Sequence, residues 1–335
     1  MIGGILVTHA SGATGMPTSA QACSWRQVLS VPGGWFSGVA AGAGGAVWAV
    51  GYQTPRGTNK TYPLISTWNG KTWSTTVGKG FGQHEDVLAS VGGDVWTTGL
   101  RNGRPVLNRF DGQRWTTAFR EVYFGNSQRS GAVWMLEGRQ LIRIDRRGRE
   151  TRLELPSAIE EVGLFTADAR GRVWVDDTIA EKFHHWDGRR WSTYRYPGAV
   201  YLLYEMATGS PSNVWAVGNE IAHWDGRKWK ELRLGGEDEV LYDVDVLADK
   251  ALAVGQDWGR WNVHGVIAES EGTKLRRSYF GQRSRSNPPD CTACDISTVE
   301  AFEGVTFVTK REAWAVGFGD AGNDTRGVVF RGSCT

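Results

Sequence analysis

Two nearly identical octapeptides decide how this chain folds: HHWDGRRW at residues 184–191 and AHWDGRKW at residues 222–229. Shorter versions of the same phrase, TWNGKTW and RFDGQRW, stand at residues 67–73 and 109–115. Asn-Gly and Asp-Gly supply the positive φ angles that a tight hairpin requires. Each copy therefore predicts two short antiparallel strands with aromatic residues on both sides of a turn.

A second phrase, VWAVG, precedes these hairpins and recurs about every 40 residues. Its clean and degraded copies stand at residues 47–51, 95–99, 133–136, 173–176, 214–218, 251–255 and 313–317. A period of about 40 residues with this strand content is typical of a four-stranded propeller blade. The sequence therefore predicts an all-β fold, a single seven-bladed β-propeller domain over residues 23–335, with four-stranded antiparallel blades.

The composition fits short strands joined by tight turns and argues against several classes of protein. Among 335 residues there are 45 glycines and 17 tryptophans, and we expect the tryptophans to pack between blades. The net charge of +2 argues against a nucleic-acid-binding protein. No apolar run reaches the roughly 18 residues of a transmembrane segment.

The two ends of the domain complement each other. The last blade ends with VFRGSCT at residues 329–335 and lacks a fourth strand, whereas CSWRQVLSV at residues 23–31 resembles a fourth strand with no blade of its own. We predict that this N-terminal strand completes the last blade, which leaves no blade incomplete. Cys23 and Cys334 would then lie side by side and form a disulfide, in a domain expected to be monomeric.

Two further cysteines and the N-terminal segment bear on the cell compartment in which the protein is located. Cys291 and Cys294 lie in a loop inserted between blades 6 and 7, residues 280–297, and a local disulfide, half of a metal site and a redox dithiol stay open. Residues 1–22 match no blade and end in Ala-Gln-Ala, the form of a signal-peptidase site; a disordered tail is the alternative. Four cysteines that can all pair favour a secreted or extracytoplasmic protein.

The repeats VWAVG and HWDG-x-x-W resemble those of bacterial secreted seven-bladed β-propellers, in the broad kelch, galactose-oxidase-like and Asp-box-like group. The resemblance covers roughly residues 23–335 and implies a propeller fold. It implies no activity, because Asp and Gly are adjacent here, whereas the sialidase Asp-box separates them by one residue. No copper-ligand set of the galactose oxidase type is found either.

Acidic and tyrosine residues gather where the innermost strand of each blade begins. Counting back about nine residues from each VWAVG copy places these residues at one mouth of the central channel, where propellers usually bind ligands. The candidate ligand-binding residues are Asp86, Tyr123, Tyr204, Glu205, Tyr242, Asp243 and Glu303. The candidate catalytic residues are His84, Glu85, Asp86, Glu205 and Asp243, with His84 as proton carrier.

Three interpretations of this mouth are open. A non-catalytic binding module would recognise a protein, a glycan or a cationic ligand, with Ca²⁺ or another divalent cation as one candidate. A hydrolase or lyase would use two of the carboxylates as acid and base, with or without a divalent cation. In the third interpretation the acids are structural and accept backbone N–H bonds at strand ends.

Overall fold

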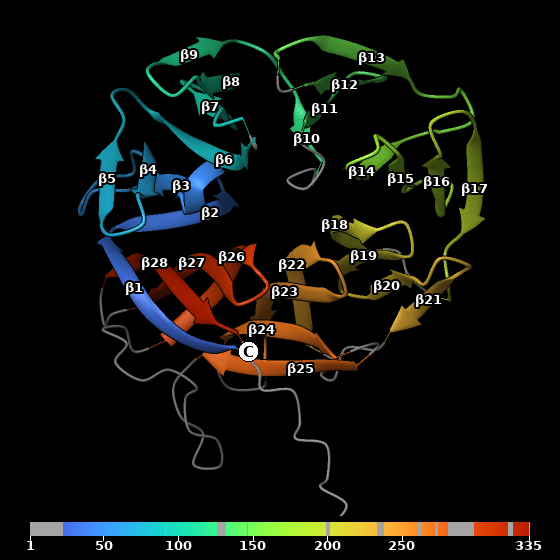
Figure 1. The fold of residues 1–335 in the computed structure, drawn as a ribbon. Coiled ribbons are helices and arrows are strands. Elements are labelled where there is room, and N and C mark those ends of the chain that lie inside the picture. Colours follow the sequence, from blue (N-terminus) through green and yellow to red (C-terminus); the bar gives the residue numbers. More distant parts are fainter. Residues whose placement is uncertain are drawn as a thin grey trace, which may run out of the picture.

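Seven β-sheets surround a central axis in the computed structural model of this protein (Figure 1). The described residues are 23–90, 92–125, 132–145, 147–198, 202–232, 238–259, 263–271, 274–280, 298–320 and 324–334. Within them, each of the seven sheets has four antiparallel strands. The predicted seven-bladed propeller is confirmed. The segment 1–22, the pair Cys291 and Cys294, and the loop after Phe280 lie outside the described residues.

Blades 1 to 6 each take four consecutive strands from the chain, with the innermost strand first (Figure 1). Blades 1 to 3 consist of β2 (Gly34–Ala41), β3 (Val47–Gln53), β4 (Tyr62–Trp68) and β5 (Trp73–Val77); β6 (Gly82–Ala89), β7 (Val95–Arg101), β8 (Arg104–Phe110) and β9 (Trp115–Ala118); and β10 (Tyr123–Phe124), β11 (Val133–Glu137), β12 (Gln140–Ile144) and β13 (Glu150–Glu154). Blades 4 to 6 consist of β14 (Val162–Ala167), β15 (Val173–Asp177), β16 (Lys182–Trp186) and β17 (Trp191–Arg195); β18 (Leu203–Ser210), β19 (Asn213–Gly218), β20 (Ile221–Trp224) and β21 (Trp229–Leu232); and β22 (Glu239–Leu247), β23 (Lys250–Asp257), β24 (His264–Glu271) and β25 (Lys274–Phe280).

Blade 7 is built from both ends of the domain. It consists of β26 (Thr298–Thr309), β27 (Glu312–Asp320), β28 (Thr325–Ser333) and, outermost, the N-terminal β1 (Ser24–Pro32). β1 pairs antiparallel with β28, with Ser24 opposite Ser333. A disulfide joins Cys23 to Cys334 just beyond this pair. The predicted ring closure and its disulfide are both confirmed.

The Asp-Gly and Asn-Gly turns form as the opening octapeptides predict. In blade 4, β16 ends at Trp186 and β17 begins at Trp191. Between them, an Asp187 carboxylate oxygen accepts the backbone N–H groups of Arg189 and Arg190 at 2.8 and 2.9 Å, and Gly188 adopts a φ of 100°. The turn therefore needs both residues of the pair, one for its side-chain acceptor and one for its backbone.

Tryptophans of the repeats fill the space between neighbouring blades. Trp215 and Trp314, both from VWAVG-type copies, are among the largest fully buried side chains. Trp174 of blade 4 packs against Trp224 and Trp229 of blade 5, with ring centroids 5.0 and 5.1 Å apart. The predicted packing role therefore holds for these residues, and exposed rings such as Trp115 and Trp258 are exceptions.

A β-bulge interrupts the innermost strand opposite the last glycine of the VWAVG copy in blades 1, 2, 5, 6 and 7, and the innermost strand of blade 4 has a register shift between Val162 and Phe165. In blade 2, His84 pairs with Gly99 and Asp86 pairs with Thr98, so Glu85 is the extra residue. The other bulges show the same arrangement opposite the last glycine of the VWAVG copy. That glycine leaves room for the bulged backbone: a β-carbon at Gly218 would lie 1.9 Å from the Leu202 carbonyl oxygen.

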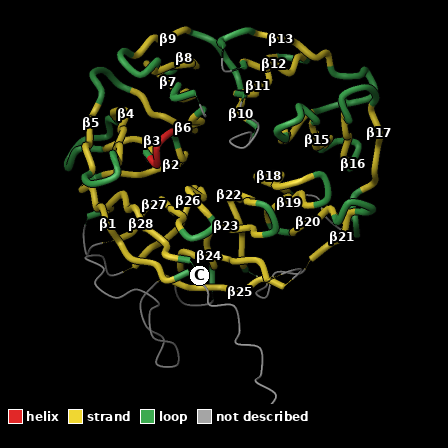
Figure 2. Tube along the Cα trace, viewed as in Figure 1, coloured by secondary structure: helices red, strands yellow, loops and turns green. Residues whose placement is uncertain are grey.

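Strands and their connecting loops make up nearly all of the ring (Figure 2). The helical exception in the described residues is a 3-10 turn, η1 (Ala43–Gly45), between β2 and β3. No helix in the described part of the chain has the length and apolar character needed to cross a membrane.

Candidate functional site at the channel mouth

A pocket of about 180 Å³ lies against the innermost strands on the central channel, and we call it the channel mouth. It is formed by the innermost strands of blades 1, 2, 5, 6 and 7. Its lining residues are Ser37, Gly38, Val39, Glu85, Asp86, Val87, Leu88, Glu205, Tyr242, Asp243 and Glu303. Five carboxylates therefore share one small pocket, and none of the lining residues is basic.

The bulges explain why neighbouring residues in the sequence reach the same pocket. In a regular strand, consecutive side chains point to opposite faces. The extra residue of a bulge changes this alternation and re-aims side chains. Glu85 and Asp86 of β6, and Tyr242 and Asp243 of β22, are each a bulge residue and its successor, and both members of each pair line the pocket.

Three of the acids accept backbone N–H bonds, as the third interpretation predicts, and Asp243 links two inner strands in this way. Asp243 accepts the N–H of Val244 at 2.7 Å with one oxygen and the N–H of Val305, in the next blade, at 2.7 Å with the other. Asp86 and Glu205 each accept the N–H of the following residue, at 2.6 and 2.8 Å. These bonds orient the carboxylates. At Asp86 and at Glu205, the bond to the following residue uses only one of the two carboxylate oxygens.

Crowding and burial change the acidity of this pocket. Burial raises the pKa of Asp86 to about 6 and that of Glu303 to about 7. Burial, with the charges of Asp243 and Asp86, raises the pKa of Glu205 well above its ordinary value. The pKa of Asp243 is raised in the same way, first by burial. The pocket therefore gains negative charge as the pH passes through neutrality, and bringing a cation into it would relieve the repulsion.

Three of the predicted site residues do not join the pocket lining. His84 precedes the bulge and lines a different pocket, between blades 1 and 2, so its predicted place beside the channel acids is wrong. Tyr123 lies in β10, where no bulge is found, and is 61% exposed. Tyr204 is half-exposed and packs edge-on against Tyr242, with ring centroids 5.7 Å apart.

A buried polar cluster in blade 4 was not predicted. Asp176 and Asp177 end the degraded VWVDD copy and are fully buried. The Tyr196 hydroxyl donates to Asp176, whose pKa burial raises to about 7. His184 Nε2 lies 3.5 Å from an Asp177 oxygen. Two acids in place of the usual Val-Gly are the sequence signal that could have indicated this cluster.

No group of three or more His, Cys, Asp or Glu side chains among the described residues is placed to hold a metal ion. The carboxylates at the mouth come from separate blades and are oriented individually by backbone N–H groups. Chelation of a divalent cation would therefore need these side chains to turn inward.

We expect replacement of two mouth acids to change how stability depends on pH. Because the folded chain raises the pKa of Asp86 and Glu303 from about 4 to about 6 and 7, both groups bind protons more tightly when folded. The contribution of these two groups to the free energy of unfolding is fully present below pH 4 and is lost as the pH rises through 6 to 7. The stability of Asp86→Asn/Glu303→Gln relative to wild type should therefore increase from pH 4 to pH 8, by at least about 1.4 kcal/mol, the equivalent of one pKa unit.

Urea unfolding at several pH values measures this difference directly. Glu154→Gln is the matched control, since Glu154 is exposed on the outermost strand of blade 3. A stability difference that stays constant with pH for the double variant would show that these carboxyl groups titrate normally in the folded protein.

The chain is similar in fold to solved propeller structures at low sequence identity. A catalytically inactive virginiamycin B lyase from Staphylococcus aureus with quinupristin is 15% identical, with a TM-score of 0.63, and covers 93% of this chain and 100% of the other. YCF48 bound to D1 peptide is 14% identical, with a TM-score of 0.58 and coverage of 95% and 96%. The RRP9 WD40 repeats are 11% identical, with a TM-score of 0.59 and coverage of 95% and 100%. No protein-family model matches the sequence, and no curated protein matches it. At these identities the likeness concerns the fold alone.

Proposed function

We propose that this chain is a binding protein that recognises a cationic group, above all a lysine or arginine side chain of a protein partner, at the channel mouth. The observation that carries the proposal is the pocket of five carboxylates without a basic lining residue. A concave site lined by one sign of charge concentrates ligands of the opposite sign. The ring of Tyr242 in the lining adds an aromatic face that suits ammonium and guanidinium groups.

The resemblance to secreted propellers and the low-identity fold matches agree with a binding role. YCF48, a propeller of similar fold, has been captured with D1 peptide. The Cys23–Cys334 disulfide supports a secreted or extracytoplasmic location.

Acid–base catalysis is the second candidate function, and one observation favours it. Glu303, with a pKa of about 7, and Asp86, with a pKa of about 6, share the pocket and lie in the range where a general acid or base works. A hydrolase or lyase would also need a group that stabilises developing negative charge. The lining supplies no positively charged side chain, so cation binding is the better supported function.

We expect small analogues of the lysine and arginine side chains to stabilise the protein. n-Butylammonium and ethylguanidinium chloride should raise the melting temperature at pH 8 above the effect of sodium chloride at equal ionic strength, because a ligand of the folded state shifts the unfolding equilibrium. The shift should shrink at pH 5, which lies below the raised pKa values of Asp86 (about 6) and Glu303 (about 7). It should vanish in Glu205→Gln/Asp243→Asn and persist in Glu154→Gln.

Calcium chloride in the same titration separates the two kinds of cation. A shift with Ca²⁺ that the organic cations do not reproduce would replace the side-chain proposal by a divalent-cation site. Equal shifts in wild type and the double variant would overturn the channel mouth as the binding site.

A further inference from the structure

A second pocket, of about 240 Å³, lies away from the channel, between blades 1 and 2. Strands β4 and β5 form one wall, and β6 to β9 form the other. His84 lines this pocket from the residue just before the β6 bulge. The bulge therefore separates two sites on one strand: acids face the channel, and the imidazole faces the space between the blades.

A chain of hydrogen bonds within blade 2 leads from its outermost strand, β9, to the imidazole of His84 on β6. Thr117 Oγ1 donates to Asn108 Oδ1 at 2.7 Å, and Asn108 Nδ2 donates to Thr97 Oγ1 at 3.1 Å. Thr97 Oγ1 lies 2.9 Å from His84 Nδ1. Thr97 is fully buried, so its hydroxyl proton needs an acceptor, and Nδ1 is within reach.

This chain determines which nitrogen of His84 carries the proton. Burial and the charge of Arg101 lower the pKa of His84 to about 4, so the ring is neutral at physiological pH. A neutral imidazole that accepts at Nδ1 carries its proton on Nε2. His84 therefore offers one N–H donor, held in place by three successive hydrogen bonds, on the nitrogen that remains for a ligand.

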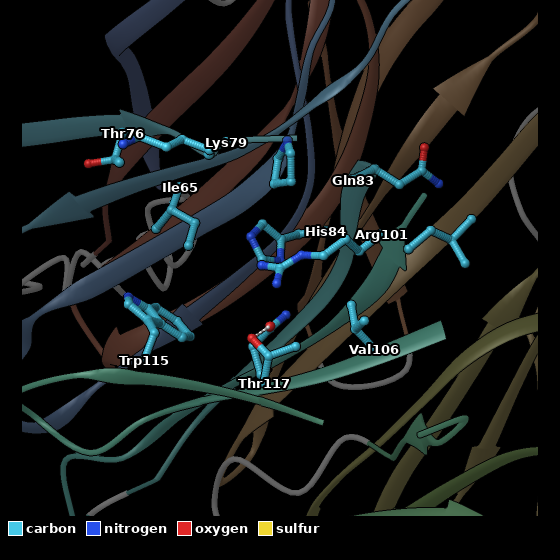
Figure 3. A pocket seen from close by; sticks show the side chains of 13 residues that line it. Ile65, Thr76, Lys79, Gln83, His84, Arg101, Val106, Trp115 and Thr117 are labelled. Atoms are coloured by element: carbon cyan, nitrogen blue, oxygen red, sulfur yellow. Dashed lines mark hydrogen bonds between the residues drawn. The ribbon is translucent and has the colours of Figure 1, made fainter. Parts of the chain in front are cut away.

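Two cations stand at the rim of the same pocket. Arg101, at the end of β7, and Lys79, between β5 and β6, are both exposed and line the pocket. Neither forms an ion pair among the described residues, and no carboxylate is found in the lining. Figure 3 shows Arg101 next to His84, with Lys79 further along the rim. A guanidinium, an ammonium and an N–H donor together favour an anionic group.

Apolar side chains form much of the remaining lining, which also includes the polar residues Thr76, Gln83, Asn108 and Thr117. Ile65 and Val106 form part of the lining, and Trp115 contributes a half-exposed indole; Figure 3 shows these side chains around the space next to His84. The volume is below the roughly 300 Å³ at which pockets for drug-sized ligands begin. Its size therefore fits a single ring or a short alkyl chain.

We propose that this pocket binds a small organic carboxylate, with the carboxylate at His84 and Arg101 and the apolar body against Ile65, Val106 and Trp115. The site is chemically opposite to the channel mouth, because one accepts anions and the other repels them. The proposal therefore does not depend on the function proposed for the channel.

Isothermal titration of the folded chain with phenylacetate, hexanoate and phenylacetamide tests this site. We expect both carboxylates to bind, and phenylacetate to bind at least about tenfold more tightly than its amide, because a charge-assisted bond is lost with the charge. Comparing the two carboxylates shows which kind of apolar body the pocket prefers in its ligand. Tighter binding of phenylacetate indicates a ring against Trp115, and tighter binding of hexanoate indicates an alkyl chain.

The variants identify the residues involved. Arg101→Gln should weaken phenylacetate binding about tenfold, whereas Arg189→Gln, at an exposed turn position of blade 4, should leave it unchanged. His84→Phe keeps a ring in place and removes the donor, so it should also weaken binding. Undiminished binding in Arg101→Gln, equal affinity for the amide, or no binding of either carboxylate at millimolar concentration would overturn the proposal.

Discussion

The Cys23→Ser variant is expected to lose about 2–5 kcal/mol of the free energy of unfolding under oxidising conditions. The disulfide between Cys23 and Cys334 spans 311 positions of the sequence, so it restricts nearly the whole unfolded chain. It also holds β1 against β28, the pairing that completes blade 7. Without it, the end of β1 at Ser24 can separate from β28 before the other blades unfold. Urea unfolding with and without dithiothreitol measures the loss.

Reduction provides the internal control for this prediction. Wild type in dithiothreitol, Cys23→Ser and Cys334→Ser should all have similar stability, and the double variant should be no worse than either single one. If Cys23→Ser were equally destabilising relative to wild type in both redox conditions, the loss would come from the packing of the cysteine and not from the covalent link.

Gly218→Ala is expected to destabilise the protein by about 2–3 kcal/mol, the cost of forcing an extra carbon into a packed site. Its β-carbon would lie 1.9 Å from the Leu202 carbonyl oxygen. That oxygen already accepts the N–H of Asn219 at 3.0 Å, so the carbonyl cannot turn away without losing a backbone bond. Because the bulge in β18 begins at this point, the substitution should also displace Glu205 from the mouth. Thermal and urea unfolding test the first effect, and the n-butylammonium titration tests the second.

Gly42→Ala is the matched control for this glycine. Gly42 has a φ of −96°, and an added β-carbon would be 3.5 Å from the nearest atom, Trp48 Nε1. We expect this substitution at a half-buried loop position to change stability by less than about 0.5 kcal/mol, because the added carbon meets only ordinary contacts. A similarly small effect of Gly218→Ala would show that the inner strand adapts and that the repeated glycine is not required by the bulge.

The repeats predicted the fold because each signal in them has a local cause. The Asp-Gly turn, the alternating aromatic residues and the VWAVG strand reappear blade after blade, so degraded copies such as VWVDD are identified by their position. Ring closure could be predicted as well, because a three-stranded blade at one end and a lone strand at the other are complementary.

For the candidate site, the sequence predicted which part of each innermost strand lines the pocket, but not always which residue of that part does so. Counting from VWAVG placed Asp86, Glu205, Asp243 and Glu303 correctly in one pocket, since the blades are equivalent by symmetry. It placed His84 with them because the bulge was not foreseen. In a regular strand His84 and Asp86 would share a face, whereas the bulge puts Asp86 with Glu85 and leaves His84 in the pocket between blades 1 and 2. Tyr123 is not among the residues that line this pocket, and its strand β10 shows no bulge over the two residues described.

The pocket between blades 1 and 2 had no signal in the sequence. Ile65, His84 and Trp115 come from β4, β6 and β9, and only the packing of two sheets brings these side chains together. A repeat pattern describes what blades share, whereas this pocket depends on residues in which one pair of blades differs from the others.

The covalent closure of blade 7 also has a mechanical consequence. A pulling force applied between the strand ends at Ser24 and Cys334 would pass through the sulfur–sulfur bond and not through the seven sheets, because the disulfide connects the two points directly. The blades would carry no load while the bond is oxidised. Reduction would transfer the whole tension to the β1–β28 pair, which would then peel apart from its Ser24 end.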